Sequence, residues 1–409
     1  MILKEPYQRQ LIILSIAAMF AGLLFSRAIL SCGMGLLFIT VLLSGDLKKN
    51  LQLILVNRYY LLITLLFFIP LISGLWSSDN REWWNRSAVK FPLLILPLVF
   101  TALPSFTKTM YRLLSWVYIV LISAACIWSF AKYAGDSIPV QDSYSKAAVM
   151  LVPFDDDHVR FSWAVMIALI LLGKLISGFI VGRTEKYFAI LVAVWLIVYL
   201  HILAAKTGLI TFYVCFFIYC IFKLFSQKNK WLPLTGLLLP VVLAIAAYLL
   251  LPTFHNRVHY ILWDFQQYSQ GVFLPGTSDG ARVVSWIGGW KIFSHNFLSG
   301  VGFGDVWNNM QQFYDTQFSY LLPHDRLFPN QFLMYASGAG IIGLFIFSLA
   351  VLIPFFIRNI RKDLYQVSFY AGTLICFLTE MNLEGQYGVF LYGFFVCWFN
   401  DKHLLKSEN

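Results

Sequence analysis

The chain has 409 residues, of which 59% are hydrophobic and only 12% are charged. Water-soluble domains carry about 25% charged residues, so this composition excludes an ordinary soluble fold and predicts an all-α integral membrane protein. The formal net charge of +10 does not indicate nucleic acid as a partner, because the basic residues stand between apolar runs, where they orient a chain in the bilayer.

The apolar runs follow one another along most of the chain. A helix rises about 1.5 Å per residue, so runs of about 15 to 22 residues can cross a hydrocarbon core of roughly 30 Å. We therefore expect about twelve transmembrane helices, the first of them uncleaved, at approximately 11–29, 31–44, 59–76, 88–104, 112–131, 160–178, 187–204, 207–225, 232–251, 332–357, 365–380 and 386–399.

The basic residues predict the orientation of these helices. With the N-terminus in the cytoplasm, most of the thirty lysines and arginines fall in inward-facing segments, as the positive-inside rule requires. Three parts follow: nine helices in 1–251, a long periplasmic loop at about 252–331 between helices 9 and 10, and three helices with a cytoplasmic tail in 332–409. The expected location is an inner membrane, crossed many times, with the active site facing the periplasm.

Two basic residues stand at the outer ends of predicted helices. Arg160 follows Asp157 and His158 at the start of the sixth helix, and Lys206 lies in the very short hairpin Ala204–Gly208. A cation at this depth is costly unless it is paired, so each suits an anionic ligand such as a lipid phosphate. Extension of the side chain to the lipid headgroups is the equally ordinary alternative.

The long loop is rich in aromatic and polar side chains. Within it, 281–293 has the pattern of an amphipathic helix on the outer membrane surface, with Arg282, Trp286 and Trp290 at helical spacing. Such aromatic faces suit a sugar ring, and they suit the headgroup belt of a membrane as well. The turn 300–305 contains three glycines, which would let backbone N–H groups approach a ligand.

His324 and Arg326 stand just before the tenth predicted helix. A histidine of ordinary pKa on the outer face can remove a proton from a hydroxyl nucleophile, although an ordinary solvated histidine would look the same in the sequence. No histidine, cysteine or carboxylate cluster in the loop has metal-ligand spacing, and we expect neither a metal nor another cofactor.

Three stretches of the chain resemble the O-antigen ligase and polymerase superfamily of bacterial membrane glycosyltransferases. They are 205–209, 282–305 and 324–344, which are similar to the family's Ser-Arg or Ala-Arg pair, its Arg, Trp and Gly-x-Gly pattern, and its His-Asn segment followed by a glycine-rich stretch. Lys206 stands where the family usually has arginine, and His324 stands six residues before Asn330 rather than beside it.

The resemblance implies transfer of a glycan from undecaprenyl pyrophosphate to a lipid A core sugar at the periplasmic face. It implies a metal-independent, inverting reaction in which His324 activates the acceptor hydroxyl and Trp286 and Trp290 stack on sugar. The expected pyrophosphate-binding residues are Arg282, Lys206, Arg326 and Arg160. Joining of carrier-linked repeats by an O-antigen or exopolysaccharide polymerase is the alternative. A polysaccharide transporter is less favoured, since the predicted spans hold almost no ionisable residues at mid-membrane.

Overall fold

The computed structural model describes residues 5–44, 57–104, 106–146, 148–180, 182–226 and 230–400, and every regular element in these segments is a helix. The all-α prediction is therefore confirmed for the described part of the chain. Each of the twelve apolar runs coincides with a helix: α1 (Glu5–Phe25), α2 (Arg27–Ser44), α4 (Arg58–Ser73), α6 (Pro92–Ala102), α7 (Lys108–Gly135), α9 (His158–Gly178), α10 (Arg183–Leu203), α11 (Lys206–Ser226), α12 (Trp231–Gly236) with α13 (Leu239–Leu250), α17 (Gln331–Leu352), α19 (Leu364–Thr379) and α20 (Gln386–Asn400).

Not all of these helices are long enough to span a membrane alone. Seven segments of the described chain combine the length and the apolar composition that crossing needs, namely α1, α7, α9, α10, α11, the α12–α13 pair and α17 with the turn after it. The apolar helices α2, α4 and α19 are shorter, and α6 has only 11 residues. The count of twelve spans therefore stays a prediction.

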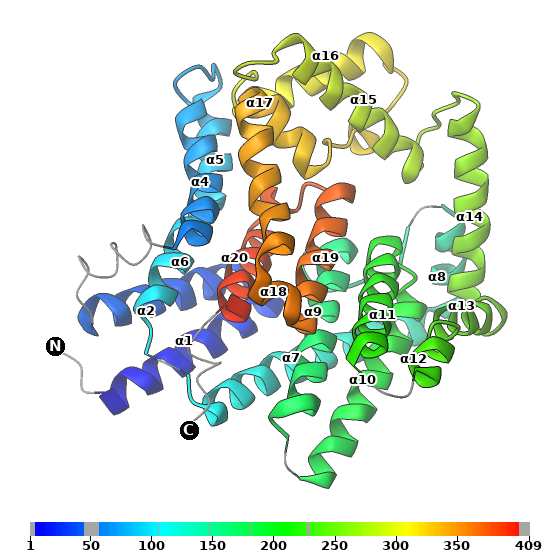
Figure 1. The fold of residues 1–409 in the computed structure, drawn as a ribbon. Coiled ribbons are helices and arrows are strands. Elements are labelled where there is room, and N and C mark those ends of the chain that lie inside the picture. The colour runs from blue at the N-terminus through cyan, green and yellow to red at the C-terminus, as the bar shows by residue number, and fades with distance from the viewer. Residues whose placement is uncertain are drawn as a thin grey trace.

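The segment 252–331, expected to be a long loop, is largely helical. It contains α14 (Pro252–Ser269), α15 (Asp279–His295) and α16 (Val306–Gln317). In Figure 1, α15 and α16 lie together at one end of the molecule, over the beginning of α17. Polar residues interrupt each of these helices, so none produces the continuous apolar run by which the other helices were predicted.

Helix α15 confirms the helix expected at 281–293, but its surroundings differ from the prediction. It packs against α14, α16 and α17, and its buried face contains glycine, alanine and serine residues. The Ser337 hydroxyl of α17 donates to the Gly289 carbonyl oxygen at 3.0 Å. Small residues allow this close approach, so α15 is part of a helical layer and not an isolated surface helix.

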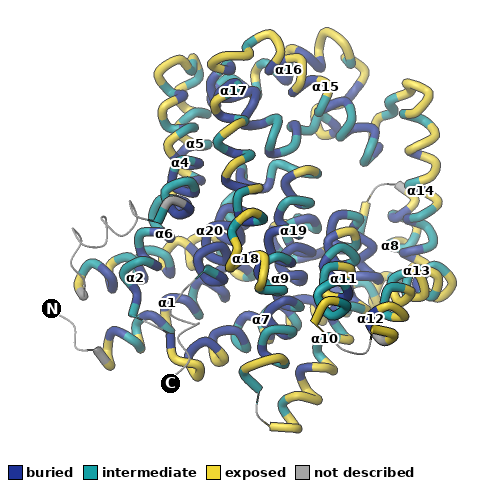
Figure 2. The backbone as a smooth tube through the Cα atoms, in the orientation of Figure 1, coloured by how far each residue is buried: buried dark blue, intermediate teal, exposed yellow. Residues whose placement is uncertain are grey.

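The molecule has its most buried helices at its centre. Thirteen of the fifteen residues of α20 are buried, and Figure 2 shows buried residues concentrated along α9, α19 and α20. By contrast, α11 and the α12–α13 pair expose many apolar side chains, which suits helices that face lipid.

The glycine-rich turn at 300–305 donates its backbone N–H groups to other segments of the protein. The N–H groups of Val301 and Gly302 donate to the carbonyl oxygens of Ser337 and Gly338 at 2.8 and 3.0 Å. The Phe303 N–H donates to the Ser73 hydroxyl oxygen at 3.0 Å. The expectation that these N–H groups approach a ligand is wrong, because the protein itself satisfies them.

Candidate functional site

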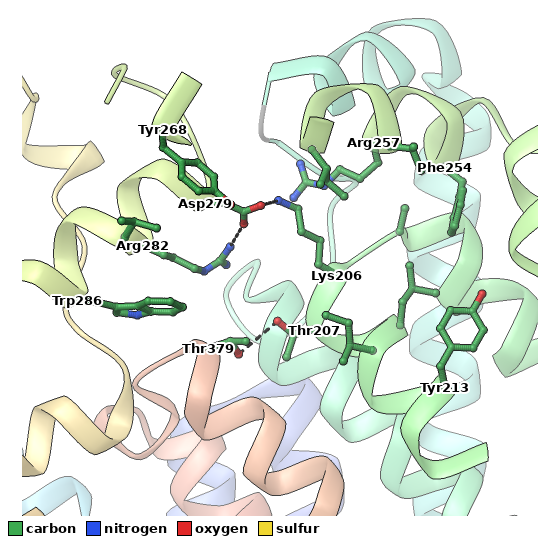
Figure 3. A pocket seen from close by; sticks show the side chains of 16 residues that line it. Lys206, Thr207, Tyr213, Phe254, Arg257, Tyr268, Asp279, Arg282, Trp286 and Thr379 are labelled. Carbon is green, nitrogen blue, oxygen red and sulfur yellow. Dashed lines mark hydrogen bonds and ion pairs between the residues drawn. The ribbon is translucent and has the colours of Figure 1, made fainter. Parts of the chain in front are cut away.

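A cavity of about 440 Å³ lies between α11, α14, α15 and the end of α19. Figure 3 shows that cationic side chains from three different helices reach it. Most of its remaining wall is apolar, with Leu209, Ile210 and Phe254 among the residues that line it. Concave, mostly apolar sites with a few converging charged groups are typical of ligand-binding sites.

Lys206 reaches the cavity because of the hairpin between α10 and α11. Ala204 ends α10 in the left-handed conformation, at φ 46° and ψ 31°, so the chain reverses at once and α11 begins at Lys206. The ammonium nitrogen lies 2.5 Å from Asp279 Oδ2, and 15% of the side chain is exposed. The predicted short hairpin is thereby present, and its cation is paired inside the protein.

Arg282 lies one helical turn after Asp279 in α15. Its guanidinium contacts Asp279 at 3.2 Å and Glu380 at 2.6 Å. Burial alone would lower the pKa of Arg282, but Glu380 and Asp279 hold this pKa above its ordinary value. Asp279 thus joins Lys206 and Arg282 across the cavity, as the dashed lines of Figure 3 show.

Arg257 is the third cation of the cavity, and sequence reasoning assigned it no role. Its side chain is 4% exposed, and its Nε and Nη1 have no hydrogen-bond partner among the described residues. The guanidinium carbon lies 5.3 Å from the centre of the Tyr260 ring, and burial lowers the pKa of Arg257. A buried guanidinium with unmet donors is costly, and an anionic ligand would satisfy it.

Asp264 fixes α14 relative to α15, and so fixes Arg257 relative to Arg282. Its carboxylate accepts from the backbone N–H groups of Ser278, Asp279 and Gly280 at 3.2, 2.8 and 3.3 Å. These are orphan donors at the start of a helix, which a carboxylate satisfies with favourable charge. These hydrogen bonds join α14 to the start of α15, so they fix the positions of Arg257 and Arg282 relative to each other.

Two predicted site residues lie away from this cavity. His324 is in a 3₁₀ turn with 75% of its side chain exposed, and it does not line the cavity. Arg326 contacts Asp315 and Gln311 at 2.7 Å each, which ties this turn to α16. The structure thus places Arg326 in an internal ion pair and leaves His324 in contact with solvent.

Arg160, Trp286 and Trp290 lie in three different environments. Arg160 pairs with Asp157 and donates to the Met381 carbonyl oxygen at 3.0 Å, so it supports the turn after α19 and does not line the cavity. Trp286 lines the cavity, and its indole N–H is buried without a partner in the described chain. Trp290 is 60% exposed on the outside of α15.

His158, the first residue of α9, is a further histidine near the cavity. It is half-buried and interacts electrostatically with Arg282, Arg257 and Lys206. The sequence shows His158 only as a neighbour of Arg160, because its proximity to Arg257 and Arg282 depends on the tertiary fold.

The fold and the cavity define a multi-pass, all-helical membrane protein in which three cations line one cavity beside an apolar wall. Residues 191–348 match the model of a protein family described as O-antigen ligase. The match confirms the resemblance to the O-antigen ligase superfamily, supports a glycosyltransferase-type activity, and covers Lys206, Arg257 and Arg282. Comparison with curated proteins gave no match.

Proposed function

We propose that the chain is an O-antigen ligase-like glycosyltransferase that moves a glycan from undecaprenyl pyrophosphate to a lipid A core sugar. The observation that carries the proposal is the convergence of Lys206, Arg257 and Arg282 on one cavity with an apolar wall. Pyrophosphate needs several positive donors, and a polyprenyl chain needs an apolar path, so this cavity suits both parts of a lipid-linked donor. The cavity would face the periplasm, as the distribution of basic residues predicts.

In the proposed reaction the acceptor hydroxyl oxygen attacks the anomeric carbon, and the bond from that carbon to the pyrophosphate oxygen breaks. The electron pair of the broken bond stays on undecaprenyl pyrophosphate, where the three cations stabilise the charge without a metal. Attack from the side opposite the leaving group inverts the anomeric carbon. Trp286 on the cavity wall would stack on the sugar next to the pyrophosphate.

The hydroxyl proton needs an acceptor, and two histidines are placed for different acceptor positions. His324 would take it if the acceptor sugar approaches from the solvent side of the turn 323–325, over which this side chain is exposed. His158 would take it if the hydroxyl enters the cavity, although burial and the three cations near His158 oppose its protonation. We propose His324 as the base, with His158 as the residue to be compared with it.

The test is a lipopolysaccharide gel from a strain that lacks the protein, complemented with wild type, His324→Ala or His158→Ala at matched membrane abundance. We expect wild type to restore long glycan on lipid A core and His324→Ala to leave polymerised glycan on the carrier. Full activity of His324→Ala together with loss in His158→Ala would transfer the base role to His158.

The uncomplemented strain tests the reaction itself. Core capped by a single repeat would make the protein a polymerase and overturn the ligase assignment. Unchanged long glycan on the core would overturn the proposed function altogether.

A further inference from the structure

Two histidines and a tyrosine form a cluster where α13 meets α14. His255 and His259 lie about one turn apart on α14, and Arg257, between them, points to the opposite side of that helix. The ring centres of the two histidines are 4.6 Å apart. Tyr248, from α13, packs against both, with its ring centre 4.6 Å from that of His255 and 6.1 Å from that of His259.

The ring nitrogens of this cluster are open to a ligand. Within the described segments the His255 ring has no hydrogen-bond partner, and the one hydrogen bond of the His259 ring joins Nε2 to the Tyr248 hydroxyl at 3.1 Å. His259 is exposed and His255 is partly exposed. Both ring nitrogens of the buried His201, by contrast, are bonded inside the protein.

The separation of the two rings is compatible with a shared metal ion. Zinc–nitrogen bonds are about 2.0–2.1 Å long, and the centre of an imidazole ring lies about 1.2 Å behind its nitrogen atom. Two imidazoles that meet at roughly 90–110° on one ion therefore have ring centres about 4.5–5.2 Å apart. The 4.6 Å between the rings of His255 and His259 falls within this interval.

Two histidines are fewer ligands than most zinc sites contain. In the sequence no cysteine or carboxylate accompanies them between 251 and 263, and among the described residues no three His, Cys, Asp or Glu side chains come together as a metal site. Tyr248 supplies a hydroxyl oxygen beside His259 Nε2, and water can take the remaining positions at an exposed site. The spacing of the histidines does not reveal this third ligand, because it comes from another helix.

We propose that His255, His259 and Tyr248 bind one divalent transition-metal ion of the class that prefers imidazole, such as Zn²⁺. Imidazole nitrogen suits Zn²⁺, Ni²⁺ and Cu²⁺, whereas Mg²⁺ and Ca²⁺ prefer oxygen ligands. Only Leu251 separates α13 from α14, so an ion held by both helices would fix the angle between them. None of the three ligands lines the cavity of the proposed transfer site, and the ion has no part in the proposed reaction.

The experiment is isothermal titration calorimetry of the full chain in detergent with ZnCl₂ or MgCl₂, after removal of bound metal with a chelator, together with thermal unfolding. His255→Gln and His259→Gln are the test variants. His295→Gln is the matched control, because His295 is an exposed histidine on α15 whose Nδ1 donates to the Lys291 carbonyl oxygen at 2.7 Å. We expect wild type and control to bind one Zn²⁺, which raises their unfolding temperature, and to bind no Mg²⁺.

In either test variant we expect the Zn²⁺ dissociation constant to rise by about tenfold or more, since loss even of a group that only orients a metal ligand weakens binding about 10- to 100-fold. Tyr248→Phe keeps the ring and removes the hydroxyl, so it should weaken binding by about tenfold. This variant decides the question if the histidine variants do not accumulate.

Absence of Zn²⁺ binding in wild type, or unchanged affinity in His259→Gln or Tyr248→Phe, would overturn the proposal. Equal weakening in His295→Gln would overturn it as well, because that would indicate general binding to surface histidines, and so would equal binding of Mg²⁺. None of these outcomes depends on glycan transfer, so the proposed function is tested separately.

Discussion

Arg257 shows how much of this site depends on single side chains. Lys206 and Arg282 already have carboxylate partners, whereas Arg257 presents Nε and Nη1 donors that no described residue accepts. A charged donor that is already desolvated and held in place stabilises a leaving anion without further reorganisation. Arg257 is therefore the cation of the cavity whose loss should cost most in transfer relative to its cost in stability.

We expect Arg257→Gln to lower kcat/KM for glycan transfer by about 100-fold, as removal of one preorganised donor commonly does. Arg257→Lys should recover only part of this loss, since lysine keeps the charge and loses the planar fork. Purified protein with a lipid-linked donor provides the measurement. Lys291→Gln, on the exposed side of α15, is the control and should stay near wild type. An Arg257→Gln rate close to wild type would exclude Arg257 from the site.

Asp279 should oppose the binding of an anion in the cavity, because its carboxylate occupies the space between Lys206 and Arg282. We expect Asp279→Asn to strengthen competitive inhibition by inorganic pyrophosphate by about fivefold, since one charge at roughly 4 Å in a hydrated site is worth about 1 kcal/mol. Asp279→Glu should leave the inhibition constant close to that of wild type. Weaker inhibition of Asp279→Asn would mean that Asp279 positions the two cations and does not compete for them.

At the scale of elements, a buried ion pair joins three parts of the chain. Lys90 ends α5 (Asn80–Val89), and its ammonium lies 2.7 Å from Glu384 Oε2 in the turn before α20, with both side chains almost completely buried. Gln331, which begins α17, donates to Glu384 at 3.1 Å and accepts from the Leu383 N–H at 2.6 Å. Helix–helix positions in this region therefore depend on one polar network.

Removal of Lys90 alone should leave the buried Glu384 carboxylate with only Arg86, at 3.7 Å, as its counter-charge and should cost about 3 kcal/mol. Lys90→Met combined with Glu384→Gln should regain at least half of that. Burial raises the pKa of Glu384, but Lys90 and Arg86 hold it below its ordinary value of 4.5. The stabilisation is hence complete above that value and is lost as the pH falls through the lowered pKa.

Unfolding temperatures in detergent from pH 7 down to pH 3 check this prediction. Wild type should lose more stability over the range than Glu384→Gln does. Parallel curves for the two proteins would show that the pair is not linked to protonation of Glu384.

Sequence reasoning predicted the elements better than it predicted the site. Long apolar runs mark membrane helices whatever surrounds them, so each run coincided with a helix. Helices α14 and α16 carry polar residues throughout and gave no such pattern. The partners of basic residues are distant in sequence: Arg282 pairs with Glu380, and Lys206 pairs with Asp279. In the sequence Arg257 looks like any other basic residue of the segment 252–331. Its burial marks it as a site residue, and tertiary packing determines that burial.

At the scale of the whole molecule, α20 is almost completely buried among other helices. Rings of α20 pack against rings of α1, α6 and α7, through Phe394 with Phe20 and Phe100 and through Phe395 with Tyr118. Helix α20 also contacts α9 and α19. The first and last described helices of the chain thus share one core.

This arrangement has a consequence for biogenesis. The helices that pack against α20 are synthesised before it. Their contacts with α20 can form only after α20 has left the ribosome and entered the bilayer between them. A chain that stops before Gln386 would leave Phe20, Phe100 and Tyr118 without their aromatic partners on α20. Entry of α20 is therefore the step that closes the core.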